Sequence, residues 1–530
     1  MAFDQLKSLI GKHPKPDITI KYGTAGFRTK ASYLDYVNYT VGILASLRSK
    51  YFKGQVIGVM VTASHNPPED NGVKVVDPLG TMLESSWEAY ATLLANSSHD
   101  ELITNIETII NQVGIDLNQP ANVVIARDSR ESSPRLSNST IDGINSLPNS
   151  KVTDYELFTT PQLHYITRCL NDPKFGEPTE LGYYTKLANS FKEIYQLCSN
   201  QDKISITIDA ANGVGAPKVQ QLINTQLSNE IEFKLINQDY NQPNLLNFDC
   251  GADFVKTGQR LPNNVDNVVP NKLYASFDGD ADRLICYYQN EDGKFKLLDG
   301  DKLATLMALF FQQLFEKIKD LNLNIGVVQT AYANGSSTKY IEQVLKLPVR
   351  CTPTGVKHLH HEAENFDIGI YFEANGHGTV VFAPEAEDKI FAYKPSSEEE
   401  EKSLKVLREF TRLINQCVGD AISDLLAVLI ICHYLNLSPE DWNKSYTDLP
   451  NRLTKVIVAD RSIFKTTNAE RTLVEPAGIQ EKIDSLVSQF ADARCFVRAS
   501  GTEDAVRVYA EASSPEAATS LAAQVGELLQ

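Results

Sequence analysis

The chain has 530 residues, of which 42% are hydrophobic, and its formal net charge is −17. At roughly 150 residues per domain, this length predicts three or four globular domains. The acidic balance disfavours nucleic acid and anionic membranes as partners. It also means that any phosphate-binding site must be built locally, from a few Arg and Lys side chains.

The eight cysteines are scattered and contain no C-x-x-C pair. This argues against a disulfide framework or a zinc ribbon and favours a reducing compartment. The N-terminal stretch MAFDQLKSLIGKHPKP lacks the apolar core of a signal peptide. The longest apolar run, Leu425–Cys432, is too short to span a bilayer and predicts a buried helix. We therefore expect a cytoplasmic protein with no membrane and no nucleic-acid partner.

Three short apolar runs are each followed by a small polar loop. VIGVMV leads into TASHNPPEDNG, NKLYASF into DGDADR, and DIGIYF into EANGHG. Each run has the length and the β-branched or aromatic content of a strand, and helical stretches such as Leu303–Lys317 and Ser337–Leu345 lie between them. Strands that alternate with helices predict α/β domains with mainly parallel sheets, whose ligands bind beyond the carboxyl ends of the strands. We expect the three loops to share one cleft.

Changes of composition suggest where one domain ends and the next begins. They fall near Cys198, before the strand ISITIDA, near Lys296, and in the stretch Leu437–Asp448. We therefore divide the chain into residues 1–199, 200–297, 298–440 and 441–530. The last part contains the strand-turn-strand pattern RCFVRASGTEDAVRVYAEA and an Ala-rich helix, which predicts a smaller α+β domain.

The first loop, Thr62-Ala-Ser-His-Asn-Pro-Pro, carries a candidate nucleophile. Ser64 follows a strand, and His65 next to it can belong to an activated nucleophile. The prolines fix the loop backbone. A serine in an ordinary turn or helix cap is the alternative. No G-x-S-x-G elbow surrounds Ser64, which argues against a hydrolase triad.

The second loop, Asp278-Gly-Asp-Ala-Asp-Arg, carries a candidate metal site. Three carboxylates at alternate positions after a strand can turn toward one point and hold a hard cation, and room for a phosphate oxygen favours Mg²⁺ over Ca²⁺. An EF-hand is excluded because its sixth and twelfth positions are Arg283 and Gln289. A surface acidic turn is the alternative, at the cost of burying unpaired carboxylates beside a strand.

Two further loops are suited to a sugar and a phosphate. Glu373-Ala-Asn-Gly-His-Gly offers hydrogen-bond donors and acceptors for a polyol, although an ordinary loop fits it equally well. Arg498-Ala-Ser-Gly-Thr-Glu, followed by Arg507, combines a planar cation with hydroxyls and a glycine that can form an anion nest. An ordinary hairpin turn is the alternative for this loop.

Taken together, the four loops resemble those of the α-D-phosphohexomutase family, in the order TASHNPP, DGDAD, EANGH and RASGTE along the whole chain. The joint match is highly specific. The resemblance implies an α/β protein of four domains around a central cleft, with three related α/β domains followed by a smaller one. In the order of the four parts, these would carry the phosphoserine loop, the metal-binding loop, the sugar-binding loop and the phosphate-binding loop.

The resemblance also implies a role for each matching residue. Ser64 would be the phosphoserine that donates and regains the phosphoryl group, and it would bind Mg²⁺ together with Asp278, Asp280 and Asp282. The residues expected near the transferring phosphate are Arg28, His65, Lys74 and Arg283. The residues expected to bind the sugar and its second phosphate are Thr354, Gly355, Glu373, Asn375, His377, Arg498, Ser500, Gly501, Thr502 and Arg507.

Within the family, the loops are most similar to the eukaryotic branch that acts on N-acetylglucosamine phosphates. Asn375 stands where glucose and mannose mutases usually have serine, and an amide can both donate to and accept from an N-acetyl group. The resemblance implies interconversion of N-acetylglucosamine 6-phosphate and 1-phosphate through a sugar 1,6-bisphosphate, for UDP-N-acetylglucosamine synthesis. We expect the protein to be a monomer.

Several alternatives stay open at this point. The substrate could be a plain glucose or mannose phosphate, as in other branches of the family. Asp278 could itself be the nucleophile of a phosphatase or mutase, because a D-x-D after a strand also suits an aspartyl phosphate. The protein could also bind phosphosugars as a regulator without catalysis. Finally, Val356 stands where some relatives carry His after Thr-Gly, so the general acid/base could be His65, Lys74 or Lys357.

Overall fold

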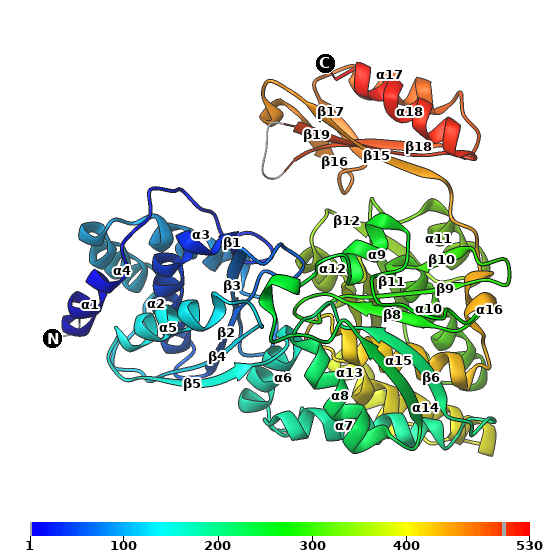
Figure 1. Ribbon diagram of the computed structural model, residues 1–530, viewed down its shortest axis with the longest axis horizontal. Coiled ribbons are helices and arrows are strands. Elements are labelled where there is room, and N and C mark those ends of the chain that lie inside the picture. The colour runs from blue at the N-terminus through cyan, green and yellow to red at the C-terminus, as the bar shows by residue number, and fades with distance from the viewer. Residues whose placement is uncertain (1–2, 501–504, 530) are drawn as a thin grey trace. The chain divides into compact units, whose positions relative to one another are not determined.

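The computed structural model describes residues 3–500 and 505–529. The chain forms two compact units, one made of Met1–Leu297 with Arg408–Asn436 and the other of Leu298–Leu407 with Leu437–Gln530. None of the helices within the described residues has the length and apolar character needed to cross a membrane. Figure 1 labels the elements named below.

The first unit begins with a five-stranded sheet in the order β1-β3-β2-β4-β5. Strands β2 and β4 are parallel, as are β4 and β5, whereas β3 runs antiparallel to both of its neighbours. Helices α2 and α5 pack against each other and against strands of this sheet. The strands are β1 (Phe27–Lys30), β2 (Val56–Val61), β3 (Asp70–Val76), β4 (Ala121–Arg127) and β5 (Ser150–Leu157). The helices are α1 (Asp4–Leu9), α2 (Leu34–Tyr51), α3 (Ser85–Asn96), α4 (His99–Val113) and α5 (Ser133–Asn145).

The second sheet has the order β10-β9-β8-β6-β7. Strand β6 is parallel to β7 and β8, and β9 is antiparallel to β8. Its strands are β6 (Ile204–Asp209), β7 (Ile231–Ile236), β8 (Tyr274–Phe277), β9 (Leu284–Gln289) and β10 (Phe295–Leu298). The other helices of the first unit are α6 (Thr160–Asn171), α7 (Glu180–Tyr195), α8 (Gly215–Leu222), α9 (Ala252–Gly258) and α15 (Ala421–Tyr434). Of these, α6 packs against β2 and β4 of the first sheet, whereas α9 and α15 pack against strands of the second sheet.

The second unit holds a four-stranded sheet in the order β12-β11-β13-β14. Strand β11 is parallel to β12 and β13, and β14 is antiparallel to β13. The strands are β11 (Ile325–Thr330), β12 (Val349–Thr352), β13 (Ile368–Phe372) and β14 (Gly378–Phe382). The helices are α10 (Gly300–Lys317), α11 (Gly335–Lys339), α12 (Val356–Ala363), α13 (Pro384–Ala392) and the first part of α14 (Glu398–Leu413), whose residues from Arg408 on belong to the first unit.

One strand has the same surroundings in each of these three sheets. Strands β2, β8 and β13 each lie between a parallel neighbour and an antiparallel strand that follows next in the chain. All three are buried nearly throughout, which explains their continuous apolar sequences. The connections after them carry the TASHNPP, DGDADR and EANGHG loops. The three predicted functional loops are therefore equivalent positions of three related sheets.

The last domain, also in the second unit, is smaller and mainly antiparallel. A three-stranded sheet has the order β15-β19-β18, and β16 and β17 form a separate hairpin. Residues of α17 and α18 complete an apolar core on one face of the larger sheet. The elements are α16 (Pro439–Asn443), β15 (Asn451–Ile457), β16 (Lys465–Thr467), β17 (Thr472–Glu475), α17 (Ile479–Val487), β18 (Arg494–Ala499), β19 (Ala505–Glu511) and α18 (Pro515–Glu527).

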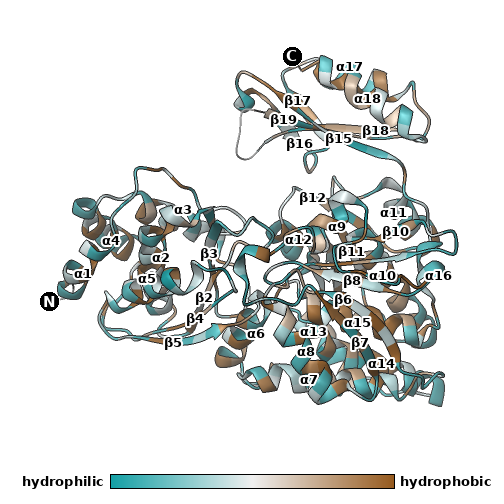
Figure 2. Ribbon diagram, viewed as in Figure 1, coloured by the Kyte–Doolittle hydropathy of each residue, from teal (hydrophilic) through white to brown (hydrophobic). Residues whose placement is uncertain are grey.

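The structure confirms the predicted α/β class and most of the elements predicted from apolar runs. The run Leu425–Cys432 is part of the buried helix α15, and Figure 2 shows such helices and the central strands as its hydrophobic regions. The predicted helix Leu303–Lys317 begins earlier, at Gly300, because the side chain of Asp299 accepts hydrogen bonds from the first free backbone N–H groups. The predicted helix Ser337–Leu345 is α11 followed by a π-helical turn over Tyr340–Val344.

Candidate active site

Ser64 lies in the connection between β2 and β3 and is only 2% exposed. Its backbone adopts a φ of 48°, a left-handed conformation that is uncommon for residues other than glycine. The Ser64 N–H donates to Thr62 Oγ1 at 3.0 Å, and Thr62 Oγ1 donates to Asp128 Oδ2 at 2.7 Å. The Ser64 hydroxyl donates to Asp280 Oδ2 at 3.1 Å. The predicted nucleophile is thus held in a fixed, strained turn against the acidic loop.

Two side chains that the sequence did not single out hold the backbone of this turn. Arg130 is buried and donates to the carbonyl oxygens of Ser64 and Asn66, each at 2.9 Å, while its Nε donates to Asp128 at 3.0 Å. Asn247 Nδ2 also donates to the Ser64 carbonyl, at 2.9 Å. These donors fix the direction of the Ser64 side chain. A sequence signal existed for Arg130, because Asp128-Ser-Arg directly follows the apolar strand β4.

The three aspartates of the second loop converge on one point. Carboxylate oxygens of Asp278, Asp280 and Asp282 lie within 4.8 Å of one another, and all three residues are buried. Asp278 Oδ1 accepts the backbone N–H groups of Asp282 and Arg283, at 3.0 and 3.1 Å, which closes the loop around the site. Burial, together with the charges of Asp282 and Asp280, raises the pKa of Asp278 well above its ordinary value.

This oxygen set fits a hard divalent cation. Within residues 3–500 and 505–529, Asp278 Oδ2 and Asp280 Oδ1 are buried and accept no hydrogen bond. Buried carboxylate oxygens without donors are costly unless a cation neutralises them. Three such groups at one point leave further coordination positions open, as Mg²⁺ requires in phosphoryl-transfer sites. The residues present therefore suit a magnesium site.

The serine loop and the acidic loop are in direct backbone contact. A Cβ atom on Gly279 would lie 2.5 Å from the Ser64 carbonyl oxygen, closer than real Cβ atoms approach. Only glycine at position 279 allows Asp278 and Asp280 to come so near to Ser64. Thr160 supports the same contact, because its hydroxyl donates to Asp280 Oδ2 at 2.6 Å and its N–H to the Asp280 carbonyl at 3.2 Å. Thr160 was not identified from the sequence.

Basic side chains surround Ser64. Arg28, on β1, lies with Nη2 3.4 Å from Ser64 Oγ, and Lys74, on β3, lies with Nζ 3.4 Å from both Asp280 Oδ2 and Asp282 Oδ2. Arg283 Nε lies 3.9 Å from Asp278 Oδ2. Burial, aided by the positive charges of Arg283 and Arg28, lowers the pKa of His65 to about 3. His65 is therefore neutral at physiological pH in this state.

The EANGHG loop connects β13 and β14 in the second unit. The Glu373 N–H donates to the carbonyl of His377 at 2.9 Å, and the His377 N–H donates to Asn375 Oδ1 at 3.0 Å. Asn375 Nδ2 lies 3.4 Å from Glu373 Oε2. The loop therefore holds Glu373, Asn375 and His377 together at the end of the sheet. Lys357 lies on α12 of the same domain, two residues after Gly355.

The phosphate-loop residues lie on β18, on β19 and in their connection. Arg498 and Arg507 are directly opposite each other in the β18–β19 pair, and the Ser500 N–H donates to the Ala505 carbonyl at 2.8 Å. Gly501 and Thr502 lie outside the described residues. Each unit thus brings together its own share of the predicted site, with Ser64 and the metal site in the first and the sugar and phosphate loops in the second.

A carboxylate already contacts the phosphate-loop arginine. Glu470, between β16 and β17, lies with Oε1 3.3 Å from Arg498 Nε. Its Oε2 accepts the N–H of Thr354 at 3.0 Å and the Thr354 hydroxyl at 2.5 Å. Glu470 therefore bridges two of the predicted substrate-binding segments. No motif pointed to it, because a lone glutamate in a hairpin loop carries no signal of its own.

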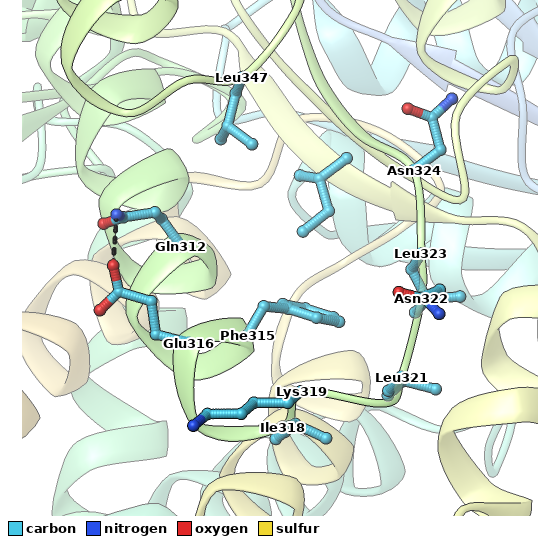
Figure 3. A pocket seen from close by; sticks show the side chains of 11 residues that line it. Gln312, Phe315, Glu316, Ile318, Lys319, Leu321, Asn322, Leu323, Asn324 and Leu347 are labelled. Carbon is cyan, nitrogen blue, oxygen red and sulfur yellow. Dashed lines mark hydrogen bonds between the residues drawn. The ribbon is translucent and has the colours of Figure 1, made fainter.

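A hollow of about 430 Å³ in the second unit lies away from these loops. Figure 3 shows it beside the end of α10, with Phe315, Leu323 and Leu347 among its lining residues. It borders the starts of β11 and β12, whereas the Thr354 and Glu373 loops follow the carboxyl ends of β12 and β13. It therefore lies at the opposite edge of the sheet from the predicted sugar loop.

Family models match four successive parts of the chain. Those described as phosphoacetylglucosamine mutase AMG1, domain II and domain III, match residues 176–285 and 299–437. Those described as phosphoglucomutase/phosphomannomutase, alpha/beta/alpha domain I and C-terminal domain, match residues 44–98 with 94–175, and 453–528. The phosphoacetylglucosamine mutase of Candida albicans is 68% identical over 545 residues, with 100% of both chains covered.

Solved structures agree with these matches. A crystal structure of N-acetylglucosamine-phosphate mutase in its substrate complex has a TM-score of 0.97 at 69% identity and covers 100% of both chains. The N-acetylphosphoglucosamine mutase of Aspergillus fumigatus with GlcNAc-6P and magnesium has a TM-score of 0.95 at 50% identity, covering 99% of this chain and 98% of that chain. A further structure from that organism contains glucose 1,6-bisphosphate.

Proposed function

The chain belongs to the phosphoacetylglucosamine mutase family of α-D-phosphohexomutases, and from that premise we propose that it interconverts N-acetylglucosamine 6-phosphate and N-acetylglucosamine 1-phosphate. The observation that carries the proposal is the hydrogen bond from the Ser64 hydroxyl to Asp280, inside a buried cluster of carboxylates. A serine in this position can carry a phosphoryl group beside a bound cation. The relatives named above act on the acetylated sugar, which favours it over plain hexose phosphates.

Four side chains would hold the cation. Asp278, Asp280 and Asp282 offer their carboxylate oxygens, and Ser64 offers a phosphoryl oxygen once it is phosphorylated. When bound, Mg²⁺ would neutralise negative charge on the transferring phosphoryl group. The relative from Aspergillus fumigatus that contains magnesium supports this choice of ion.

Residues around Ser64 would position and stabilise the transferring group. Arg28 and Lys74 place positive charge within 3.4 Å of Ser64 Oγ and of its acidic neighbours, respectively. The sugar hydroxyl oxygen forms a new bond to phosphorus while the bond from phosphorus to Ser64 Oγ breaks. The hydroxyl proton passes to a base, for which His65, Lys74 and Lys357 are the candidates, and Ser64 Oγ takes up a proton. Positioning and electrostatics supply most of the catalysis in such transfers.

The second unit would hold the part of the substrate that does not react. Glu373, Asn375 and His377 would bind sugar hydroxyls and the acetamido group, beside Thr354 and Gly355. Arg498, Ser500, Gly501, Thr502 and Arg507 would bind the other phosphate. Because the bisphosphate intermediate must present each phosphate to Ser64 in turn, this second group would recognise the phosphate and not the sugar.

We also infer that the enzyme acts as a cytoplasmic monomer. All eight cysteines lie within the described residues and none is in a disulfide, which suits a reducing compartment. Each of the four predicted domains, residues 1–199, 200–297, 298–440 and 441–530, carries one of the four predicted loops, so a single chain holds the complete set.

The direct test is turnover of the proposed substrate. We expect purified protein with Mg²⁺ and a trace of sugar 1,6-bisphosphate to convert N-acetylglucosamine 6-phosphate into the 1-phosphate, followed by ³¹P NMR. The ratio of kcat/KM for this sugar to that for glucose 6-phosphate should exceed one. A ratio below one would move the proposal to the plain hexose phosphates, and no turnover of either sugar would leave a non-catalytic role.

A further inference from the structure

Helix α6 begins with a residue that contacts Asp280 twice. The N–H of Thr160 donates to the Asp280 carbonyl at 3.2 Å, and the Thr160 hydroxyl donates to Asp280 Oδ2 at 2.6 Å. Capping of the helix does not need this hydroxyl, because the side chains of Thr159 and Gln162 form the capping box. Thr160 is buried, so water does not compete for the contact. The Thr160 hydroxyl is therefore committed to a carboxylate of the acidic loop.

The backbone of the acidic loop is fixed independently of this hydroxyl. The three successive carbonyls of residues 279–281 accept backbone N–H groups at 3.2, 3.2 and 3.0 Å. Each donor stands at the start of a different helix, where N–H groups lack partners within the helix. The donors are Val214 before α8, Thr160 in α6 and Ala421 in α15. A substitution that changes only the side chain of Thr160 leaves all three hydrogen bonds in place.

The two carboxylate oxygens of Asp280 have different surroundings. Oδ2 accepts the hydroxyls of Thr160 at 2.6 Å and Ser64 at 3.1 Å, and Lys74 Nζ lies 3.4 Å from it. Oδ1 is buried and accepts no hydrogen bond from any of the described residues. Because each carboxylate oxygen offers about two lone-pair sites, the donors around Oδ2 use its capacity. Oδ1 is therefore the oxygen that Asp280 can offer to a cation.

Phosphorylation of Ser64 would leave this arrangement to Thr160. A phosphoserine has no proton on Oγ, so the hydrogen bond from Ser64 to Asp280 Oδ2 would be lost. Lys74 is a weaker partner, because its Nζ is 3.4 Å from Asp280 Oδ2 and equally far from Asp282 Oδ2. The hydrogen bond from Thr160 is the shortest of the three contacts and does not depend on the state of Ser64.

We propose that Thr160 is a positioning residue that holds Asp280 Oδ2, so that Asp280 binds the cation through Oδ1 alone and the acidic site favours Mg²⁺ over Ca²⁺. Mg²⁺ requires near-ideal octahedral geometry at about 2.0–2.1 Å, whereas Ca²⁺ takes about six to eight oxygens and accepts carboxylates through one or both of them. An Asp280 that could offer both oxygens would suit Ca²⁺ better. The inference rests on the proposed function, because it assigns Thr160 to the metal site of that reaction.

The test separates the hydroxyl of Thr160 from the shape of its side chain. Thr160→Val removes the hydroxyl and keeps the shape, whereas Thr160→Ser keeps the hydroxyl. The full chain without substrate is titrated with Mn²⁺, a paramagnetic ion that also occupies octahedral oxygen sites, and binding is followed by electron paramagnetic resonance. Ca²⁺ is then titrated against the bound Mn²⁺. Mass spectrometry confirms that Ser64 is in the same phosphorylation state in every variant.

The two ions should respond differently to loss of the hydroxyl. Thr160→Val should raise the Kd of Mn²⁺ about tenfold, the usual cost of losing a hydrogen bond to a metal ligand. The Kd of Ca²⁺ should change by less than about threefold, because the released oxygen can join its coordination. Thr160→Ser should keep both values within about twofold of wild type. A role of Thr160 in folding alone would not change the ratio of the two Kd values.

The matched control is Thr167→Val, at another buried threonine of α6. The Thr167 hydroxyl donates to the Leu163 carbonyl at 2.8 Å, within the helix, so its loss should leave both Kd values unchanged. Thr160→Ala is a second variant without the hydroxyl and should give the same result as Thr160→Val. It replaces Thr160→Val if circular dichroism shows that the valine variant does not fold.

Three outcomes would overturn the inference: an unchanged Kd of Mn²⁺ without the hydroxyl, an equal loss in Thr160→Ser or Thr167→Val, or parallel losses for Mn²⁺ and Ca²⁺. Wild-type protein that does not bind Mn²⁺ would overturn it as well. None of these measurements uses the sugar. Intact protein that shows the binding differences but does not turn over N-acetylglucosamine 6-phosphate would refute the proposed function and leave the assignment of Thr160 standing.

Discussion

In the first unit the proposed nucleophile and metal ligands are buried and hydrogen-bonded to neighbouring groups, whereas in the second unit two of the proposed binding residues, Arg498 and Thr354, are partly exposed and share one partner, Glu470. Ser64 is 2% exposed, and Asp278 and Asp280 are 0% exposed. By contrast, the side chains of Arg498 and Glu470 are 23% and 18% exposed. Groups that react must be held in place before the substrate arrives. Groups that release and regain a phosphate must exchange partners in every cycle.

The largest difference between the units should appear on removal of the nucleophile. Ser64→Ala should lower kcat by about 10⁴-fold or more, because loss of an attacking group removes the covalent route. The Kd for N-acetylglucosamine 6-phosphate should change by less than about twofold, since the binding groups of the second unit remain. Steady-state kinetics and calorimetry measure the two quantities. Ser86→Ala, on the exposed start of α3, is the control.

Ser64→Ala also distinguishes the phosphoserine mechanism from the alternative in which Asp278 is the nucleophile. If Asp278 were the nucleophile, Ser64→Ala would keep most of its activity and only Asp278→Asn would lose it. That outcome would mean that the buried aspartates of the first unit form an aspartyl phosphate.

The next largest effect should come from the metal site. Asp280→Asn should lower kcat by about 10³-fold, because the carboxylate is both a proposed ligand of Mg²⁺ and the acceptor of the Ser64 hydrogen bond. Mn²⁺ binding, followed by electron paramagnetic resonance, should weaken in parallel. Chelation of the wild-type metal should abolish turnover, and Mg²⁺ should restore it. Asp266→Asn, on an exposed loop, should behave as wild type, and an Asp280→Asn variant with normal Mn²⁺ binding would contradict the assignment.

A substitution in the phosphate loop of the second unit should weaken substrate binding more than it slows the reaction. Arg498→Ala should raise KM by about 10- to 100-fold, the cost of losing a charge-assisted contact to phosphate, with a smaller change in kcat. Initial rates over a range of substrate concentrations measure both constants. Arg452→Ala, on strand β15 of the same sheet, is the control. A fall in kcat with constant KM would show that this loop contributes to phosphoryl transfer and not to binding. The proposed division of reacting and binding roles between the two units would then be wrong.

The smallest expected effect comes from changing Glu470, the carboxylate that is paired with Arg498. Glu470→Gln should lower KM by about two- to fourfold, because an incompletely buried ion pair of this kind is worth less than about 1 kcal/mol and competes with phosphate for Arg498. Glu475→Gln, which removes a carboxylate paired with Lys465 on the same hairpin, is the matched control. A raised KM would mean that Glu470 helps to shape the phosphate site.

The sequence predicted the loops because each one is a short, local signal. VIGVMV, NKLYASF and DIGIYF are apolar strands that end in small polar residues, and the structure places them at equivalent positions of three sheets. That equivalence was not visible in the sequence. The order of strands in a sheet depends on hydrogen bonds between segments far apart in the chain, and the three loop regions share only an apolar run followed by a polar loop.

The site residues that could not be identified from the sequence contact residues that are far away along the chain. Arg130 contacts the Ser64 carbonyl across 66 residues, Thr160 contacts Asp280 across 120, and Glu470 contacts Thr354 across 116. A buried arginine, a threonine at a helix start and a hairpin glutamate are each common features with ordinary structural uses. Only the folded arrangement shows that they hold the predicted site residues.

The phosphoserine mechanism is tested most directly by peptide mass spectrometry of Ser64 before and after exposure to substrate. We expect a phosphate on Ser64 after incubation with a sugar 1,6-bisphosphate and Mg²⁺. That phosphate should leave when N-acetylglucosamine 6-phosphate is added and appear in the bisphosphate. A Ser64 that stays unmodified under these conditions, in protein that still turns over its substrate, would show that the phosphoryl group does not pass through this serine.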